Sequence, residues 1–88
     1  MNKAVRKELS EVIGLLNGID LEDIGQTLTD LQAEEQDKFD NLSEGLQASD
    51  KGLTLEQAAD NLQCALDSLE EARAALDEVI SYIEEATA

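Results

Sequence analysis

Apolar residues recur every seven positions near the end of the chain, and this spacing predicts a long amphipathic helix. A leucine or isoleucine stands at each repeat, and a smaller apolar residue follows three positions later. The first set, the Leu55 row, is Leu55, Leu62, Leu69, Leu76 and Ile83, and the second set, the Ala58 row, is Ala58, Ala65, Ala72 and Val79. Because Thr54 and Gln57 match a capping box, we expect this helix over 54–87. Its apolar face needs another helix to cover it.

The residues that flank this repeat favour a helical bundle over a parallel two-stranded zipper. With Leu55 as position a, the e positions are partly apolar and the g positions are uncharged. The e positions are Ala59, Leu66, Arg73 and Ile80, and the g positions are Asn61, Ser68, Ala75 and Tyr82. A parallel zipper usually carries opposite charges at e and g. The broad a, d, e stripe instead suits a helix with two neighbours in a bundle, and alanine at d allows a partner backbone to approach.

Two shorter helices are predicted before the long one. The first, over 3–17, has its apolar residues on one stripe, and an Asn-Gly pair supplies a stop signal. The second, over 20–42, starts with an aspartate cap and has apolar residues at spacings of three and four. The stripes are Val5, Leu9, Val12, Ile13 and Leu16 in the first helix and Leu21, Ile24, Leu28 and Leu31 in the second. Gly14 either allows a close approach of another helix or is merely tolerated.

The middle of the chain is its least regular part. Consecutive polar residues from Glu34 to Asp37 interrupt the second stripe, and we expect the helix to continue across them. The segment over 43–53 is rich in Ser, Asp and Gly, so it is predicted to be the main connection. Leu42 and Leu46 are four residues apart, which leaves room for a single buried turn in this linker.

Together these elements predict an all-α fold, a bundle of about three helices with a long C-terminal helix, in one domain over 1–88. A domain of 88 residues has a thin core, so we expect oligomerisation to complete the bundle, with a homodimer as the expected state. Self-association is expected through the apolar face of the long helix. The residues concerned are Leu55, Leu62, Leu66, Leu69, Leu76, Ile80, Ile83 and Tyr82.

The formal net charge of −15 restricts the partners that the chain can bind. From Glu8 onward, 21 acidic residues face only three basic ones. A chain this acidic is repelled by nucleic-acid phosphates and by anionic lipids, so neither direct nucleic-acid binding nor membrane binding is expected. Basic proteins are the favoured partners.

The sequence lacks the residues of common catalytic and metal sites. With no histidine and a single cysteine, Cys64, the usual zinc, haem and iron–sulfur ligand sets are excluded, and Ser or Cys nucleophiles lack their base. An EF-hand loop that starts at Asp37 would need an oxygen ligand at its third position, where Phe39 stands. Carboxylate pairs need a low-dielectric pocket, whereas these acids fall on polar faces. We therefore expect no cofactor, no metal and no enzymatic activity, and Cys64 is predicted to be an exposed, incidental thiol.

Acidic rows on the polar face of the long helix form a candidate binding surface. Its residues are Glu70, Glu71, Asp77, Glu78, Glu84 and Glu85. One acidic helix carries one negative charge per roughly 4 to 5 Å of its length, and two such helices side by side carry one per roughly 2 Å. Duplex DNA carries one charge per about 1.7 Å of its axis. The surface is therefore either a solvated face that keeps the bundle soluble or, once assembled, an imitation of nucleic acid.

The stretch from Glu34 to Gln47, EEQDKFDNLSEGLQ, is followed by SDKG and an acidic helix rich in Leu and Ala. It resembles small hypothetical proteins of bacteriophages and prophages, in which a proline often stands where this chain has Ser43. The resemblance covers roughly Glu34 to Glu85 and brings no known activity. It implies expression inside a bacterial host, where such proteins often act by binding host or phage proteins.

The leading hypothesis is a non-enzymatic acidic helical protein that self-associates and binds a protein partner. A lone cysteine and the lack of any long apolar run predict a cytoplasmic location, and the resemblance implies that the cell is a bacterial host. The alternative is an acidic DNA-mimic inhibitor of a host nucleic-acid-binding or defence protein. A third possibility is a structural part of a phage particle.

Overall fold

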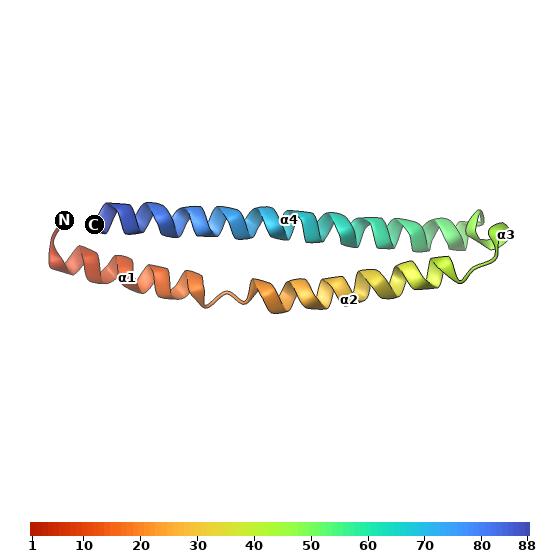
Figure 1. Cartoon of the computed structure of the whole chain (residues 1–88), viewed down its shortest axis with the longest axis horizontal. Helices are drawn as coiled ribbons and strands as arrows, with labels where there is room; N and C mark the ends of the chain where they lie inside the picture. Colours follow the sequence, from red (N-terminus) through yellow and green to blue (C-terminus); the bar gives the residue numbers. More distant parts are fainter.

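The chain forms four helices joined by short turns, and the computed structural model describes all of residues 1–88. The helices are α1 (Lys3–Asn17), α2 (Leu21–Asp40), the single-turn α3 (Glu44–Gln47) and α4 (Asp50–Thr87). α4 runs antiparallel to α1 and α2, which follow each other end to end along it (Figure 1). The predicted all-α fold with a long C-terminal helix is therefore confirmed.

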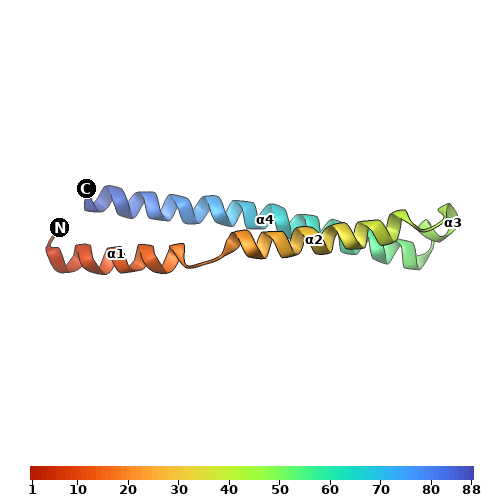
Figure 2. The same ribbon diagram turned by 60° about the horizontal axis from the view of Figure 1, so that its bottom comes forward.

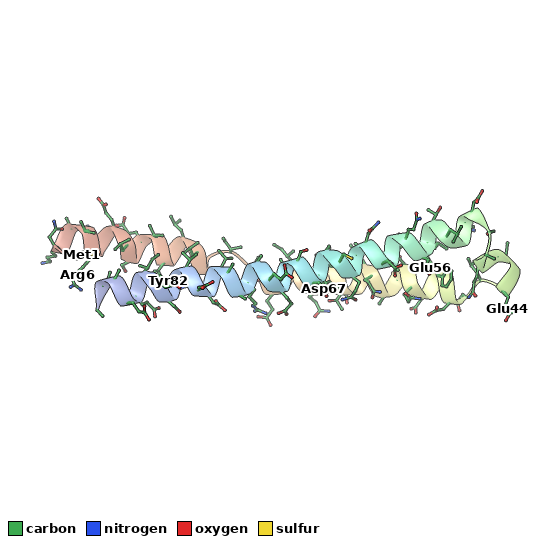
Figure 3. All side chains as sticks on the ribbon, turned by 90° about the horizontal axis from the view of Figure 1, so that it is seen from above. Met1, Arg6, Glu44, Glu56, Asp67 and Tyr82 are labelled. Atoms are coloured by element: carbon green, nitrogen blue, oxygen red, sulfur yellow. The ribbon has the colours of Figure 1, made fainter.

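The long helix is covered by two helices of its own chain. α4 has 38 residues and is about 57 Å long, whereas α2 has 20 residues and α1 has 15. Because α1 and α2 lie in line, together they follow α4 along nearly its whole length (Figure 2). At the open end, the Arg6 guanidinium donates a hydrogen bond to the Thr87 carbonyl oxygen, which joins α1 to the last turn of α4 (Figure 3). The length of α4 alone therefore does not require a second subunit.

Polar side chains begin the first two helices, as the sequence predicts for α2. The Asn2 side chain accepts a hydrogen bond from the Val5 N–H at 2.9 Å, and the Asp20 carboxylate accepts one from the Asp23 N–H at 2.9 Å. Each cap satisfies a backbone donor that has no partner inside its helix. α2 then continues without a break through the polar run in its second half, as expected, and ends at Asp40.

The predicted start of the long helix is wrong. α4 begins at Asp50, where Ser49 is the cap and accepts a hydrogen bond from the Gly52 N–H at 3.4 Å. Thr54 lies inside the helix, and its hydroxyl donates to the Asp50 carbonyl oxygen at 2.9 Å. A hydroxyl that bonds the carbonyl four residues earlier cannot serve as the cap. The capping-box pattern at Thr54 and Gln57 is therefore coincidental.

The turn between α3 and α4 requires a glycine. A Cβ atom on Gly52 would overlap the carbonyl oxygens of Leu46 and Gln47 and lie 2.6 Å from the Gln47 carbonyl carbon. The segment predicted as a linker over 43–53 thus contains α3 and the first turn of α4. The single turn expected there is present, but Leu46 is 51% exposed and not buried. The chain reverses too tightly at this point to cover Leu46.

The contact between the two arms of the hairpin, here called the seam, uses two rows of α4. These are the Leu55 row and the next row along the helix surface, the Ala59 row, which consists of Ala59, Leu66, Arg73, Ile80 and Thr87. With Leu55 as position a, the seam therefore runs between a and e. The Ala58 row, at d, lies on one side of it, and Ala65, Ala72 and Val79 are exposed. The d alanines therefore lie beside the contact within the hairpin, and the approach of a partner backbone to them stays a prediction.

The opposite side of the seam comes from α1 and α2. The half-buried residues there are Leu9, Ile13 and Leu16 of α1, and Leu21, Gly25, Leu28, Gln32, Glu35, Gln36, Phe39 and Leu42 of α2 and its end. Gln32 and Glu35 make the middle of this row polar. A Cβ atom on Gly25 would lie 3.4 Å from the Leu69 side chain, whereas one on Gly14 would have no neighbour within 4 Å. Gly14 is therefore merely tolerated, and Gly25 is the glycine at a helix contact.

The hairpin is long and thin, so it has almost no interior. Its principal extents are 68 × 16 × 14 Å, and its radius of gyration is 20.2 Å, against about 12 Å for a compact domain of this length. Only Gly52 and Ala59 are buried. The predicted thin core is confirmed, and the side chains of the seam are only partly shielded from water.

Candidate functional site

The structure places the residues expected to self-associate on two different surfaces. Leu55, Leu62, Leu66, Leu69, Leu76, Ile80 and Ile83 are half-buried in the seam. Their apolar faces are already in use within one chain. Tyr82 lies outside the seam and is 65% exposed (Figure 3). A role of these residues in self-association stays a prediction, and only Tyr82 among them is largely free to meet a partner.

One side of the hairpin, here called the apolar edge, is lined by apolar residues from three helices, all of which except the half-buried Ala58 are exposed. These are Val5 and Val12 of α1, Ile24 and Leu31 of α2, and the Ala58 row of α4. Val12, Ile24, Leu31 and the members of the Ala58 row each stand three residues after a half-buried residue of the seam, and Val5 stands seven residues before Val12. In antiparallel helices this common offset places all of them on the same side. Leu31 and Ala58 confirm the placement, because they line one shallow groove together with Asn61 and Leu62.

The sequence contained a signal for the apolar edge that the prediction did not use. Val5 and Val12 were assigned to the first apolar stripe, and Ile24 and Leu31 to the second. In the structure all four are exposed. Stripes this broad exceed what one antiparallel contact can cover, so their excess width pointed to a second apolar surface.

The other side of the hairpin, here called the acidic edge, carries negative side chains. Each follows directly after a seam residue, and the members are Glu22 of α2 and Glu56, Glu70, Asp77 and Glu84 of α4. Glu22 and Glu70 line a second shallow groove with Asp67 and Arg73, which shows that α2 and α4 contribute to the same side. The second predicted acidic row, Glu71, Glu78 and Glu85, is exposed on the outer surface of α4.

Negative charge on this protein is almost entirely uncompensated. Every acidic residue except Glu35 is exposed. The only ion pairs join Lys38 to Glu35 at 3.0 Å and to Glu34 at 3.8 Å. The hydrogen bond and the charge of Glu35, with a smaller contribution from Glu34, raise the pKa of Lys38 above its ordinary value. Ile24, Leu31 and Lys38 are spaced seven residues apart on α2. Lys38 is the only charged residue of this row and stands at its end near α3.

The hairpin contains no cluster of metal-ligating side chains and no unpartnered buried polar side-chain atom. No group of three or more His, Cys, Asp or Glu side chains is placed to hold a metal ion. No buried side-chain nitrogen or oxygen lacks a hydrogen-bond partner. Cys64 is exposed, as predicted. The hairpin thus presents apolar side chains on one edge and anionic side chains on the other.

Comparisons with known proteins add no relative. No family model, no curated protein and no solved structure matches the chain. None of the four helices combines the length and the apolar character that a membrane crossing requires.

Proposed function

We propose that this chain is a non-enzymatic interaction protein that self-associates and presents acidic surfaces to a basic protein partner. The observation that carries the proposal is the separation of its surface into an apolar edge and an acidic edge on opposite sides of the seam. Exposed apolar residues cluster along one side of the molecule, which is typical of a protein–protein contact. The acids on the other side attract basic proteins and repel nucleic acid.

The distribution of the carboxylates supports a role without catalysis. General acid–base work by a carboxylate pair needs one member in a dry pocket that alters its pKa. The acidic edge instead borders shallow grooves, and its side chains are exposed. Arg73 is the only basic side chain in the groove lined by Glu22 and Glu70. These groups are arranged to attract a charged surface, not to enclose a substrate.

Sedimentation equilibrium and a pull-down test the two parts of the proposal. We expect an oligomer at micromolar concentration, and a folded monomer of 9.6 kDa at all concentrations would contradict self-association. Tagged protein expressed in the cytoplasm of bacteria, including phage-infected cells, should retain a basic protein. That capture should weaken as salt rises, because charges on a surface are screened. Copurification with virions would instead indicate a structural role.

Imitation of nucleic acid is the second candidate, and the density of acids on the paired helices favours it. α2 carries seven acids, and the segment of α4 opposite it carries five between Glu56 and Glu71. Twelve charges over about 30 Å correspond to one per about 2.5 Å, close to the value for duplex DNA of about 1.7 Å. A DNA-binding defence protein is the class of target that such a surface fits.

Competition with DNA for a basic host nuclease tests this second candidate. The variant Glu70→Gln, Asp77→Asn, Glu84→Gln removes three charges from the acidic edge and leaves the seam intact. We expect it to compete less well than the wild type at low salt. The matched variant Glu71→Gln, Glu78→Gln, Glu85→Gln removes three charges from the outer row and shows which row matters. Unchanged inhibition by both variants would exclude mimicry.

A further inference from the structure

We infer that the apolar edge is the surface through which two copies of this chain associate, side by side, as a four-helix bundle. The inference rests on the proposed self-association and names the surface that performs it. It moves the contact away from the seam residues predicted from the sequence. Those residues already contact the chain's own helices, whereas the apolar edge has no partner.

The apolar edge is continuous and uncharged over most of the molecule. Val5 and Val12 lie opposite the C-terminal half of α4, and Ile24 and Leu31 lie opposite its N-terminal half, so the four side chains form a line beside the Ala58 row. The only charged residue in these rows is Lys38, at the end near α3. The alanines of α4 leave space for the side chains of a helix that approaches from outside.

The hairpin exposes more excess area than a second copy would bury in a standard interface. One chain exposes 6393 Å², whereas a compact monomer of this mass exposes about 5,100 Å². The excess is about 1,300 Å². A standard stable interface buries about 800 Å² on each partner. Contact between two apolar edges would therefore bring the exposed area per chain close to that of an ordinary globular protein.

Charge selects this edge as the place where a second copy can approach. Each copy carries a formal charge of −15, so any contact through the acidic edge or the outer faces brings like charges together. Side by side along their apolar edges, two copies keep their acidic edges on opposite sides of the bundle. Since each hairpin is 14 to 16 Å across, the two acidic edges lie farther apart than the screening length of about 8 Å at physiological ionic strength. A basic partner is then left free to bind the acidic edges.

The surface is also compatible with itself, as a two-fold contact requires. In such an interface the same patch is presented by both copies. Each edge supplies one line of larger aliphatic side chains and one line of small ones. The charged side chains beside them, Lys38 and its ion-pair partner Glu35, lie toward the end near α3. Packing four helices in this way covers Ile24 and Leu31, and also widens the half-buried seam into a true core.

Two exposed alanines of α4 provide a matched test. Ala72 lies on the apolar edge, whereas Ala74 is exposed on the far side of the same helix turn. Sedimentation equilibrium should show a dimer for the wild type and for Ala74→Glu. Ala72→Glu should raise the dimer dissociation constant at least tenfold, and Ile24→Glu on α2 should do the same. Circular dichroism of each variant establishes that its helices remain folded.

The possible outcomes separate this inference from the proposed function. A wild type that stays monomeric overturns both the apolar edge as a dimer interface and the proposed self-association. A dimer that Ala72→Glu and Ile24→Glu leave intact overturns the apolar edge as the interface but retains self-association. A monomer whose capture of another protein is lost in Ala72→Glu assigns the edge to that protein and overturns the dimer.

Discussion

Gly25 of α2 faces Leu69 of α4 so closely that a Cβ atom on Gly25 would lie 3.4 Å from the Cδ2 atom of Leu69. This is ordinary van der Waals contact, and it occurs near the middle of α4. An alanine at this position would therefore touch Leu69 without displacing it. The pair therefore marks a point at which the two arms of the hairpin depend on each other's packing.

Leu69→Ala should lower the free energy of unfolding by about 1 to 3 kcal/mol, because half-buried apolar contacts are lost. This loss of stability is smaller than the largest losses seen for fully buried leucines, since Leu69 is only partly shielded from water. Leu15→Ala is the matched control, because Leu15 is 76% exposed. We expect it to change stability by less than about 0.5 kcal/mol. Urea unfolding at one fixed protein concentration measures both, and equal effects would contradict this packing.

Gly52→Ala should destabilise the hairpin by about 1 to 3 kcal/mol, because its Cβ atom would overlap the backbone of Leu46 and Gln47. Gly45→Ala is the control, since a Cβ atom there meets nothing within 4 Å. Alanine also favours a helix more than glycine does, so Gly45→Ala should be neutral or slightly stabilising. Thermal unfolding followed by circular dichroism compares them. A Gly52→Ala variant as stable as the wild type would show that the turn can open without cost.

Gly14→Ala should stabilise the protein by about 0.5 to 1 kcal/mol, because alanine loses less backbone freedom than glycine when a helix forms. The site offers space, since a Cβ atom on Gly14 has no neighbour within 4 Å. Chemical denaturation measures the gain. A loss of stability would instead indicate that another helix packs against Gly14 in the assembled protein.

Added sodium chloride should raise the melting temperature. Asp30 with Glu34 and Asp67 with Glu71 are like-charge pairs four residues apart on helix surfaces, and salt screens their repulsion. Only Lys38 forms ion pairs that salt would weaken. A double variant, Asp67→Asn with Glu71→Gln, should respond less to salt than the wild type. An unchanged melting temperature up to about 1 M, where the screening length is about 3 Å, would contradict the argument.

Periodicity predicted the helices well because each helix depends on the spacing of its own apolar residues. The observed α1 has the same bounds as the helix expected over 3–17, and α2 differs from its prediction by one or two residues at each end. The start of α4 was misplaced because Thr54 and Gln57 have the residue types of a cap. Whether such a pair forms a cap depends on where the chain turns, and here the tight contact at Gly52 sets the turn.

The candidate site was predicted only in part for a related reason. The acidic rows follow from residue spacing on one helix, and the structure exposes them as expected. The apolar edge combines residues of three helices, so it depends on how these helices are arranged around one another. A broad stripe on each helix indicates surplus apolar surface, but not which part of it the chain covers.

By itself, the sequence determined the all-α fold, the long acidic C-terminal helix, the thin core and the absence of the usual catalytic residues, because these depend on composition and local spacing. Only the tertiary structure decided that α1 and α2 cover α4 in line, and that the Leu55 and Ala59 rows meet them. The same packing leaves Ala65, Ala72 and Val79 exposed on the side of Val12 and Leu31. One antiparallel contact shields only part of a broad helical stripe, and the direction of each helix selects which part stays open.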